Sequence, residues 1–196
     1  MEPKTFIFIG RSGCGKGTQV DLVKKYLAEN DSARELYHME TGNRFREFIK
    51  GDGYASKRTR QIVEAGKRVH SFVAIWLWSS GFIENMREDK HLVVDGSPRT
   101  KNEAEILHTV MEFFNRSKPC IIYMDVSREW AIDRLTGRGR SDDSDVKKVN
   151  EKQDFFENDV LPAIRWYEQN DFYHFVRING EQSIEGVHAD IMKAVF

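Results

Sequence analysis

The stretch 10-GRSGCGKGT-18 directly follows the apolar run 5-TFIFI-9 and decides the fold. Glycine loses more conformational freedom on folding than other residues, so four glycines within nine residues need a physical reason. In the pattern G-x-x-x-x-G-K, bare backbone N–H groups converge on an anion, and the N-terminus of a helix lies behind them. The stretch therefore predicts a buried strand, a phosphate-binding loop and a helix, with Lys16 directed at the outer phosphates and Thr18 at a Mg²⁺ ion.

Short apolar runs alternate with longer segments of helical pattern along the rest of the chain. The runs lack polar alternation over most of their length, which is typical of strands buried on both faces of a parallel sheet. We expect strands at 5–9, 35–39, 91–95, 119–126 and 173–178. We expect helices at 17–29, 42–50, 56–65, 69–88, 101–116, 127–137, 145–169 and 183–195. This order predicts an α/β fold, a five-stranded parallel sheet flanked by helices, with ligands beyond the carboxyl ends of the strands.

The composition limits the class of protein. A length of 196 residues suits one compact domain, and a net charge of −1 provides no overall basic field for a nucleic-acid partner. No apolar run approaches the roughly 20 residues that span a bilayer, and no secretory signal is recognised, so we expect no membrane partner. The two cysteines, Cys14 and Cys120, are too few for a disulfide framework, and we expect a cytoplasmic location.

Further motifs decide among the proteins that carry such a loop. They are 40-ETGNRFR-46, 95-DGSPRT-100, 133-DRLTGR-138 and 140-RSDD-143. In this order, and with Gly17 between Lys16 and Thr18, they make nearly the whole chain resemble the adenylate kinases and their nucleoside monophosphate kinase relatives. The family patterns are T-G-x-x-x-R, D-G-F-P-R-T and R-x-D-D. Gly17 also argues against a P-loop switch protein, which would have serine or threonine directly after the lysine.

The resemblance implies one P-loop kinase domain over 1–196, with a helical monophosphate-binding flap at 42–70 and a short lid at 138–143. The implied reaction is the reversible, Mg²⁺-dependent transfer of the γ-phosphoryl group of ATP to AMP, which gives two ADP by direct in-line transfer. ATP and a nucleoside monophosphate would be the partners of a monomeric enzyme. The alternatives are a kinase for GMP or for CMP and UMP, and an inactive nucleotide-binding regulator.

The resemblance also assigns roles to individual residues. ATP would be held by Gly13, Cys14, Gly15, Lys16, Gly17, Thr18, Arg134, Arg138 and Gln182. The monophosphate would be held by Thr41, Gly42, Arg46, Lys67, Arg68, Val69, Gly96, Arg99, Glu103, Arg140 and Lys152. The catalytic cations would be Lys16, Arg99, Arg138 and Arg140, and Mg²⁺ would be ordered by Thr18 and, through water, Asp95. Arginine suits such a site because its planar fork grips two phosphate oxygens and keeps its proton.

Two assignments in the lid region have open alternatives. Asp142 and Asp143 would position the lid by hydrogen bonds, or would instead cap the following helix. Lys152 stands near the place of a second lid arginine, and the register also allows Glu151. A lysine would keep the charge at this place without the bidentate grip.

Glu103 is the departure that bears on the acceptor base, because adenylate kinases have glutamine there. An amide both donates to and accepts from the edge of adenine, whereas an ionised carboxylate only accepts. Glu103 would therefore suit the donor-rich edge of guanine or the amino group of cytosine. Asn102 could supply an amide if the helix starts differently. In a further alternative Glu103 is a solvated helix residue, and backbone near Lys67 to Val69 holds the base.

Overall fold

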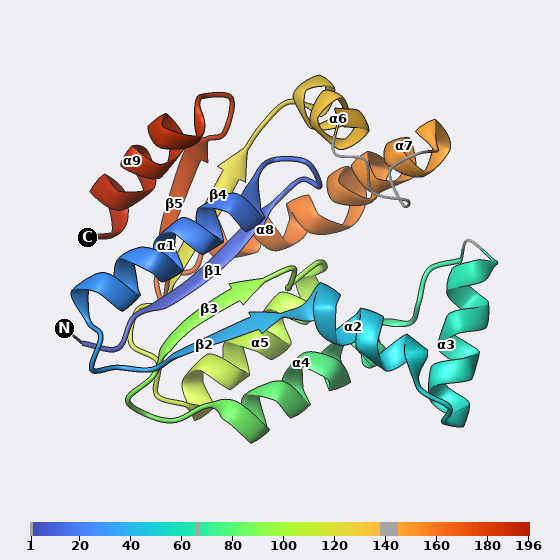
Figure 1. The fold of residues 1–196 in the computed structure, drawn as a ribbon, viewed down its shortest axis with the longest axis horizontal. Helices are drawn as coiled ribbons and strands as arrows, with labels where there is room; N and C mark the ends of the chain where they lie inside the picture. Colours follow the sequence, from blue (N-terminus) through green and yellow to red (C-terminus); the bar gives the residue numbers. More distant parts are fainter. Residues whose placement is uncertain (1, 66, 138–144) are drawn as a thin grey trace.

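The computed structural model describes residues 2–65, 67–137 and 145–196. Within them, five parallel strands form one sheet in the order β2-β3-β1-β4-β5 (Figure 1). The strands are β1 (Thr5–Gly10), β2 (Leu36–Glu40), β3 (His91–Asp95), β4 (Cys120–Asp125) and β5 (His174–Asn179). The predicted α/β class is therefore confirmed, and the carboxyl ends of all the strands lie along one edge of the sheet.

Helices cover both faces of this sheet (Figure 1). They are α1 (Lys16–Asn30), α2 (Thr41–Lys50), α3 (Tyr54–Glu64), α4 (Ser71–Asn85), α5 (Lys101–Phe113), α6 (Arg128–Gly137), α7 (Val146–Phe155), the π-helix η2 (Phe156–Val160), α8 (Leu161–Glu168) and α9 (Ile184–Val195). Within the described residues, no helix has the length and apolar character needed to cross a membrane.

The central strand β1 divides the core into two layers because successive side chains of a strand point to opposite faces. Phe6 and Phe8 pack with residues of α1, α6 and α9. Ile7 and Ile9 pack on the other face with residues of α4, α5, η2 and α8. Because both faces are buried, the strand needs apolar residues at every position, and this explains the continuous run in the sequence.

Polar side chains cap several helices that begin near the carboxyl edge. Thr100 Oγ1 accepts the N–H of Glu103 at the start of α5, and Ser183 Oγ accepts the N–H of Gly186 at the start of α9. Asp145 caps α7, a role that one alternative gave to Asp142 and Asp143. That pair lies outside the described residues.

Two regions differ from the predicted elements. The helix expected over 145–169 consists of α7, η2 and α8 in direct succession, and the π-helical turn in its middle had no signal in the apolar spacing. The predicted flap region contains α2 and α3, which project from the sheet beyond the end of β2 (Figure 1).

Candidate functional site

The loop between β1 and α1 packs so closely on α6 that it requires glycine. Gly13 has a φ of +94°, and a Cβ atom there would clash with the carbonyl oxygen of Ala131. Gly15, the N-cap of α1, also has a left-handed backbone, and no side chain caps the helix there. By contrast, a Cβ on Gly17 would meet no atom within 4 Å. The first turn of α1 therefore presents open backbone, as an anion site at a helix N-terminus needs.

The ammonium group of Lys16 lies over this loop. Its Nζ donates hydrogen bonds to the carbonyl oxygens of Gly10 at 2.7 Å and Arg11 at 2.8 Å. The Sγ of buried Cys14 is 3.4 Å from the same nitrogen. These contacts hold the positive charge at the loop and keep it from extending into solvent. At the loop it can interact with an anion that the backbone N–H groups bind.

A small cavity of about 50 Å³ joins the loop to two distant segments of the chain. Its lining includes Gly13, Cys14, Gly15 and Thr18 from the loop, Trp130 and Arg134 from α6, and Gly180 and Gln182 from the β5–α9 connection. These include six of the residues predicted to hold ATP, namely Gly13, Cys14, Gly15, Thr18, Arg134 and Gln182. Their roles stay predictions, but the fold does bring them to one place.

Trp130 is a lining residue that the sequence reasoning missed. The guanidinium carbon of Arg134 lies 4.8 Å from the centre of the Trp130 ring. The available signal was the spacing of four residues, which puts an aromatic side chain and an arginine on the same face of a helix. A cation over an aromatic ring is attracted to it, so Trp130 orients Arg134 at the cavity.

A second group of predicted residues gathers where α2 meets the β3–α5 connection. Thr41, the buried first residue of α2, donates from Oγ1 to Ser97 Oγ at 2.8 Å. Arg99 donates from Nε to the carbonyl oxygen of Gly96 at 2.7 Å. Arg46 forms an ion pair of 3.1 Å with Glu40, at the end of β2. The two arginines are exposed and held by weak contacts, so both remain available to a ligand.

Glu103 is buried, with 4% of its surface exposed. Its Oε2 accepts a hydrogen bond of 2.8 Å from the backbone N–H of Arg99. Burial raises the pKa of the carboxyl group, while this hydrogen bond and the charges of Arg99 and Arg68 act against the rise. The alternative of a solvated helix residue is therefore wrong. Asn102 is exposed on the first turn of α5, so the different helix start that would have aimed its amide at the site is not found.

Lys67, Arg68 and Val69 lie in the connection between α3 and α4. Arg68 extends to the other side of the site, where its Nη1 is 3.1 Å from Asp159 Oδ2 in η2. Its guanidinium carbon also lies 4.3 Å from the centre of the Phe155 ring in α7. The side chain of Arg68 therefore links the predicted flap to α7 and η2, a contact that the sequence did not indicate.

Several predicted residues remain outside the assembled groups. Arg138, Arg140 and the whole predicted lid at 138–143 lie outside the described residues. Lys152 is half-buried on α7, and its neighbour Glu151 is exposed. Their roles stay predictions.

Thr18 and Asp95 form the predicted Mg²⁺ site. Both offer oxygen atoms, the ligands that Mg²⁺ prefers. Asp95 ends β3 beside the central strand, and no hydrogen bond or ion pair of its carboxylate is found among the described residues. The part of the chain that the structure describes holds no cluster of three or more histidine, cysteine or acidic side chains that would form a protein-only metal centre. The two residues therefore fit an ion held mainly by phosphate and water.

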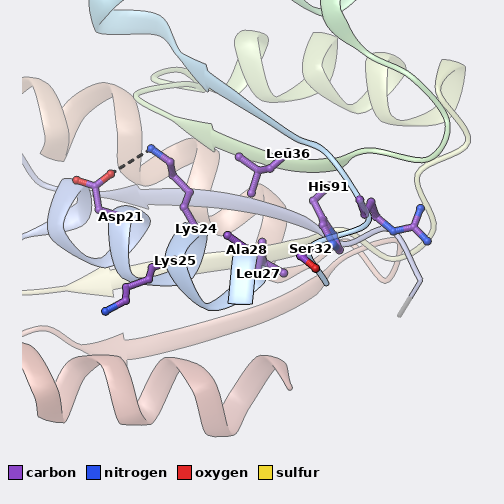
Figure 2. A pocket seen from close by; sticks show the side chains of 9 residues that line it. Asp21, Lys24, Lys25, Leu27, Ala28, Ser32, Leu36 and His91 are labelled. Carbon is purple, nitrogen blue, oxygen red and sulfur yellow. Dashed lines mark hydrogen bonds and ion pairs between the residues drawn. The ribbon is translucent and has the colours of Figure 1, made fainter. Parts of the chain in front are cut away.

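A cavity of about 490 Å³ lies at the opposite edge of the sheet. Its lining comes from α1 between Asp21 and Ala28, the following loop and the first residues of β2 and β3, Leu36 and His91. Figure 2 shows Lys24 turned toward Asp21, with which it forms an ion pair of 3.2 Å. None of the predicted site residues lines this cavity, and ligands of such sheets bind at the carboxyl edge, so we do not assign the site there.

Comparison with known proteins gives one consistent family. The family model for adenylate kinase matches residues 8–172. The chain is 27% identical to an adenylate kinase of Prochlorococcus marinus over 91% of this chain and 92% of that protein. It is 27% identical to an adenylate kinase of Corynebacterium diphtheriae over 96% of this chain and 97% of that protein. It is also 29% identical to human adenylate kinase isoenzyme 5, covering 98% of this chain and 32% of that protein.

Proposed function

The chain belongs to the adenylate kinase family of ATP-dependent nucleoside monophosphate kinases, and from that premise we propose that its acceptor is AMP and its product two ADP. One observation carries the proposal. The phosphate-binding loop, α6 and the β5–α9 connection share a cavity, and Thr41 joins the flap to the β3–α5 connection at the same edge of the sheet.

In this proposal the loop and Lys16 hold the phosphates of ATP, while Arg46 and Arg99 hold the phosphate of AMP. Phosphoryl transfer of this kind depends mainly on positioning and on neutralising charge. A phosphate oxygen of AMP is already a nucleophile, so no general base is required. Arg138 and Arg140 would add positive charge around the transferred group. Trp130 keeps Arg134 directed at the donor side.

Thr18 and Asp95 are the residues that would hold Mg²⁺, Asp95 through water. When bound, the ion would neutralise charge on the phosphates of ATP. The flap over 42–70 would exclude water from the acceptor, so that phosphoryl goes to a nucleotide and not to hydrolysis. We also propose a cytoplasmic monomer with ATP and a monophosphate as its partners. Light scattering after size-exclusion chromatography tests the monomer.

The experiment is a coupled assay of ADP production with MgATP and, separately, AMP, GMP, CMP, UMP and dTMP. Lys16→Ala is the control for activity from contaminating kinases. Turnover with AMP above all other acceptors supports the proposal. If turnover is highest with another monophosphate, that monophosphate is the acceptor and the AMP proposal is wrong. ATP binding without any turnover identifies the inactive regulator instead.

A second candidate, a kinase for GMP or CMP, is favoured by the buried carboxylate of Glu103. One of its oxygens is held by Arg99, and no hydrogen bond to the other is found among the described residues. An ionised carboxylate can only accept, which suits the N–H groups of guanine or cytosine. The Glu103→Gln variant tests this candidate. If its ratios of AMP to GMP and AMP to CMP turnover equal those of the wild type, Glu103 does not select the base.

A further inference from the structure

Two neighbouring aromatic residues at the junction of α7 and η2 each contact an arginine side chain, and the two arginines come from different parts of the site. The guanidinium carbon of Arg11, in the phosphate-binding loop, lies 4.4 Å from the centre of the Phe156 ring. The guanidinium carbon of Arg68, in the flap connection, lies 4.3 Å from the centre of the Phe155 ring. One helical segment therefore touches both the predicted donor loop and the predicted acceptor flap.

An acidic residue completes each contact. Glu157 Oε1 is 3.0 Å from Arg11 Nη1, and Asp159 Oδ2 is 3.1 Å from Arg68 Nη1. Each arginine thus meets an aromatic face and a carboxylate on the same segment. We call this pair of sites, formed by Phe155 with Asp159 and Phe156 with Glu157, the double cradle.

Among the described residues, Arg11 makes more hydrogen bonds than Arg68 does, and its side chain is less exposed. Gln153 is fully buried, accepts from Arg11 Nη1 and donates to the carbonyl oxygen of Ser12 at 3.3 Å. Arg11 also donates from Nε to the carbonyl oxygen of Val126. Its side chain is 12% exposed, against 65% for Arg68. Contacts of an exposed arginine are weak and easily exchanged, whereas a buried set resists change.

Glu157 adds a third connection. Its second oxygen, Oε2, is 3.3 Å from Nη1 of Arg128 at the start of α6, and the same nitrogen is 2.7 Å from Asp154. One carboxylate therefore bridges the phosphate-binding loop and the helix that carries Arg134. A shift of the segment would change the position of both donor-side elements together.

The segment also has an unusual backbone. Residues 156–160 form a π-helical turn, and such turns occur frequently at functional sites. Adjacent residues of a helix point in different directions, so Phe155 and Phe156 can receive arginines from two sides of the same helix.

We propose that the double cradle couples acceptor binding to donor binding, with Asp159 and Glu157 as positioning residues. The proposal rests on the proposed function, because it requires that the loop holds ATP and the flap holds the monophosphate. Movement of the flap changes the contact of Arg68 with Asp159, and η2 transmits the change to Arg11 and the loop. Coupling is reciprocal in binding free energy, so each ligand raises the affinity for the other by the same factor.

Isothermal titration calorimetry measures this factor directly. The monophosphate with the highest turnover in the coupled assay is titrated with and without saturating Mg²⁺ and adenylyl imidodiphosphate. The ratio of the two Kd values is the coupling factor, which we expect to be about fivefold or more in the wild type. In Asp159→Asn and Glu157→Gln the factor falls about threefold or more, while the acceptor Kd without donor changes much less.

Glu168→Gln is the matched control, because Glu168 lies on α8 and forms a comparable ion pair of 3.3 Å with Arg177 outside the site. This variant keeps the wild-type factor. A wild-type factor of one overturns the proposal, even when turnover is normal and the proposed function stands. A variant that weakens acceptor binding equally with and without donor also overturns it, because the cradle then only supports the fold. Absence of turnover with every acceptor is a failure of the proposed function itself.

Discussion

The backbone N–H of Arg99 donates a hydrogen bond of 2.8 Å to the Oε2 atom of Glu103. This bond ties Arg99, which we propose to hold the acceptor phosphate, to the buried carboxyl group at the start of α5. A glutamine could accept the same hydrogen bond through its amide oxygen. The hydrogen bond therefore does not require the negative charge of Glu103. Burying that charge lowers the stability of the fold, and a substitution by glutamine can measure the effect.

We predict that Glu103→Gln stabilises the protein at neutral pH. Burial raises the pKa of Glu103 in the folded state above its ordinary value of 4.5. A carboxyl with a raised folded pKa favours folding most at low pH, and this contribution is lost as the pH rises through the folded pKa. The gain from the substitution should grow as the pH rises above 4.5 and then level off. Urea unfolding from pH 4 to pH 8 checks this, and an equal difference at every pH would contradict it.

Gly13→Ala should destabilise the protein by about 1–3 kcal/mol, because the new methyl group meets the carbonyl oxygen of Ala131 and the residue has a positive φ. Gly17→Ala is the comparison, since open space surrounds that position in the first turn of α1. Alanine is a better helix former than glycine, so the thermal midpoint of the Gly17→Ala variant should equal or exceed that of the wild type. Differential scanning calorimetry of both variants measures the contrast. Equal losses in the two would refute this account of the loop.

Lys16→Ala should lower kcat about a hundredfold or more without unfolding the protein. Among the described residues, the ammonium group bonds to two carbonyl oxygens and the Cys14 sulfur of its own loop, so its removal opens no cavity in the apolar core. The coupled assay measures kcat, and circular dichroism measures the thermal midpoint. A variant that keeps wild-type kcat would remove Lys16 from the chemistry.

His91 should make stability depend on pH in the acid range. It is 1% exposed, its Nδ1 accepts the N–H of Lys4, and its Nε2 lies 3.3 Å from Asp31 Oδ2. Burial lowers its pKa below 6.5, although Asp31 opposes this. A histidine with a lowered folded pKa stabilises the fold above its unfolded pKa, and this stability is lost as the pH falls below that value.

The substitution His91→Asn removes this titration and keeps an acceptor near the Lys4 N–H. We expect an overall loss of stability together with a shallower fall in unfolding free energy as the pH falls below 6.5. Half-buried His38 and His188 remain and contribute part of the wild-type slope, since partial burial lowers their pKa values too. An unchanged slope would assign the acid sensitivity to groups other than His91.

Much of the fold could be predicted because its signals are local. The apolar runs at 5–9 and 91–95 correspond to β1 and β3 within a residue, since strands buried on both faces must be apolar throughout. The glycines at 13 and 15 indicated the loop because their backbone conformations exclude most other residues. Six residues that line the donor-side cavity, among them Arg134 and Gln182, were predicted from the family resemblance, whereas Trp130 was missed.

Other features had no local signal. The resemblance singled out Glu103, but its burial and its hydrogen bond with Arg99 follow only from the packing of α5. Arg11 and Arg68 are separated from their carboxylates by 146 and 91 positions, so no spacing rule could pair them. The π-helical turn at Phe156–Val160 inserts a residue into the helical repeat, and the spacing of apolar residues gave no sign of it.

The sequence by itself determined where the strands lie along the chain, the phosphate-binding loop and the family. It could do so because backbone conformation and burial on both faces of the sheet restrict the residue type at these positions. The tertiary structure alone decided which charges meet. Ion pairs and buried carboxylates depend on distances between segments far apart in sequence, and these distances exist only once the sheet and its helices have packed. For that reason the contacts of Glu103 and the double cradle on α7 and η2 could be found only in the folded molecule.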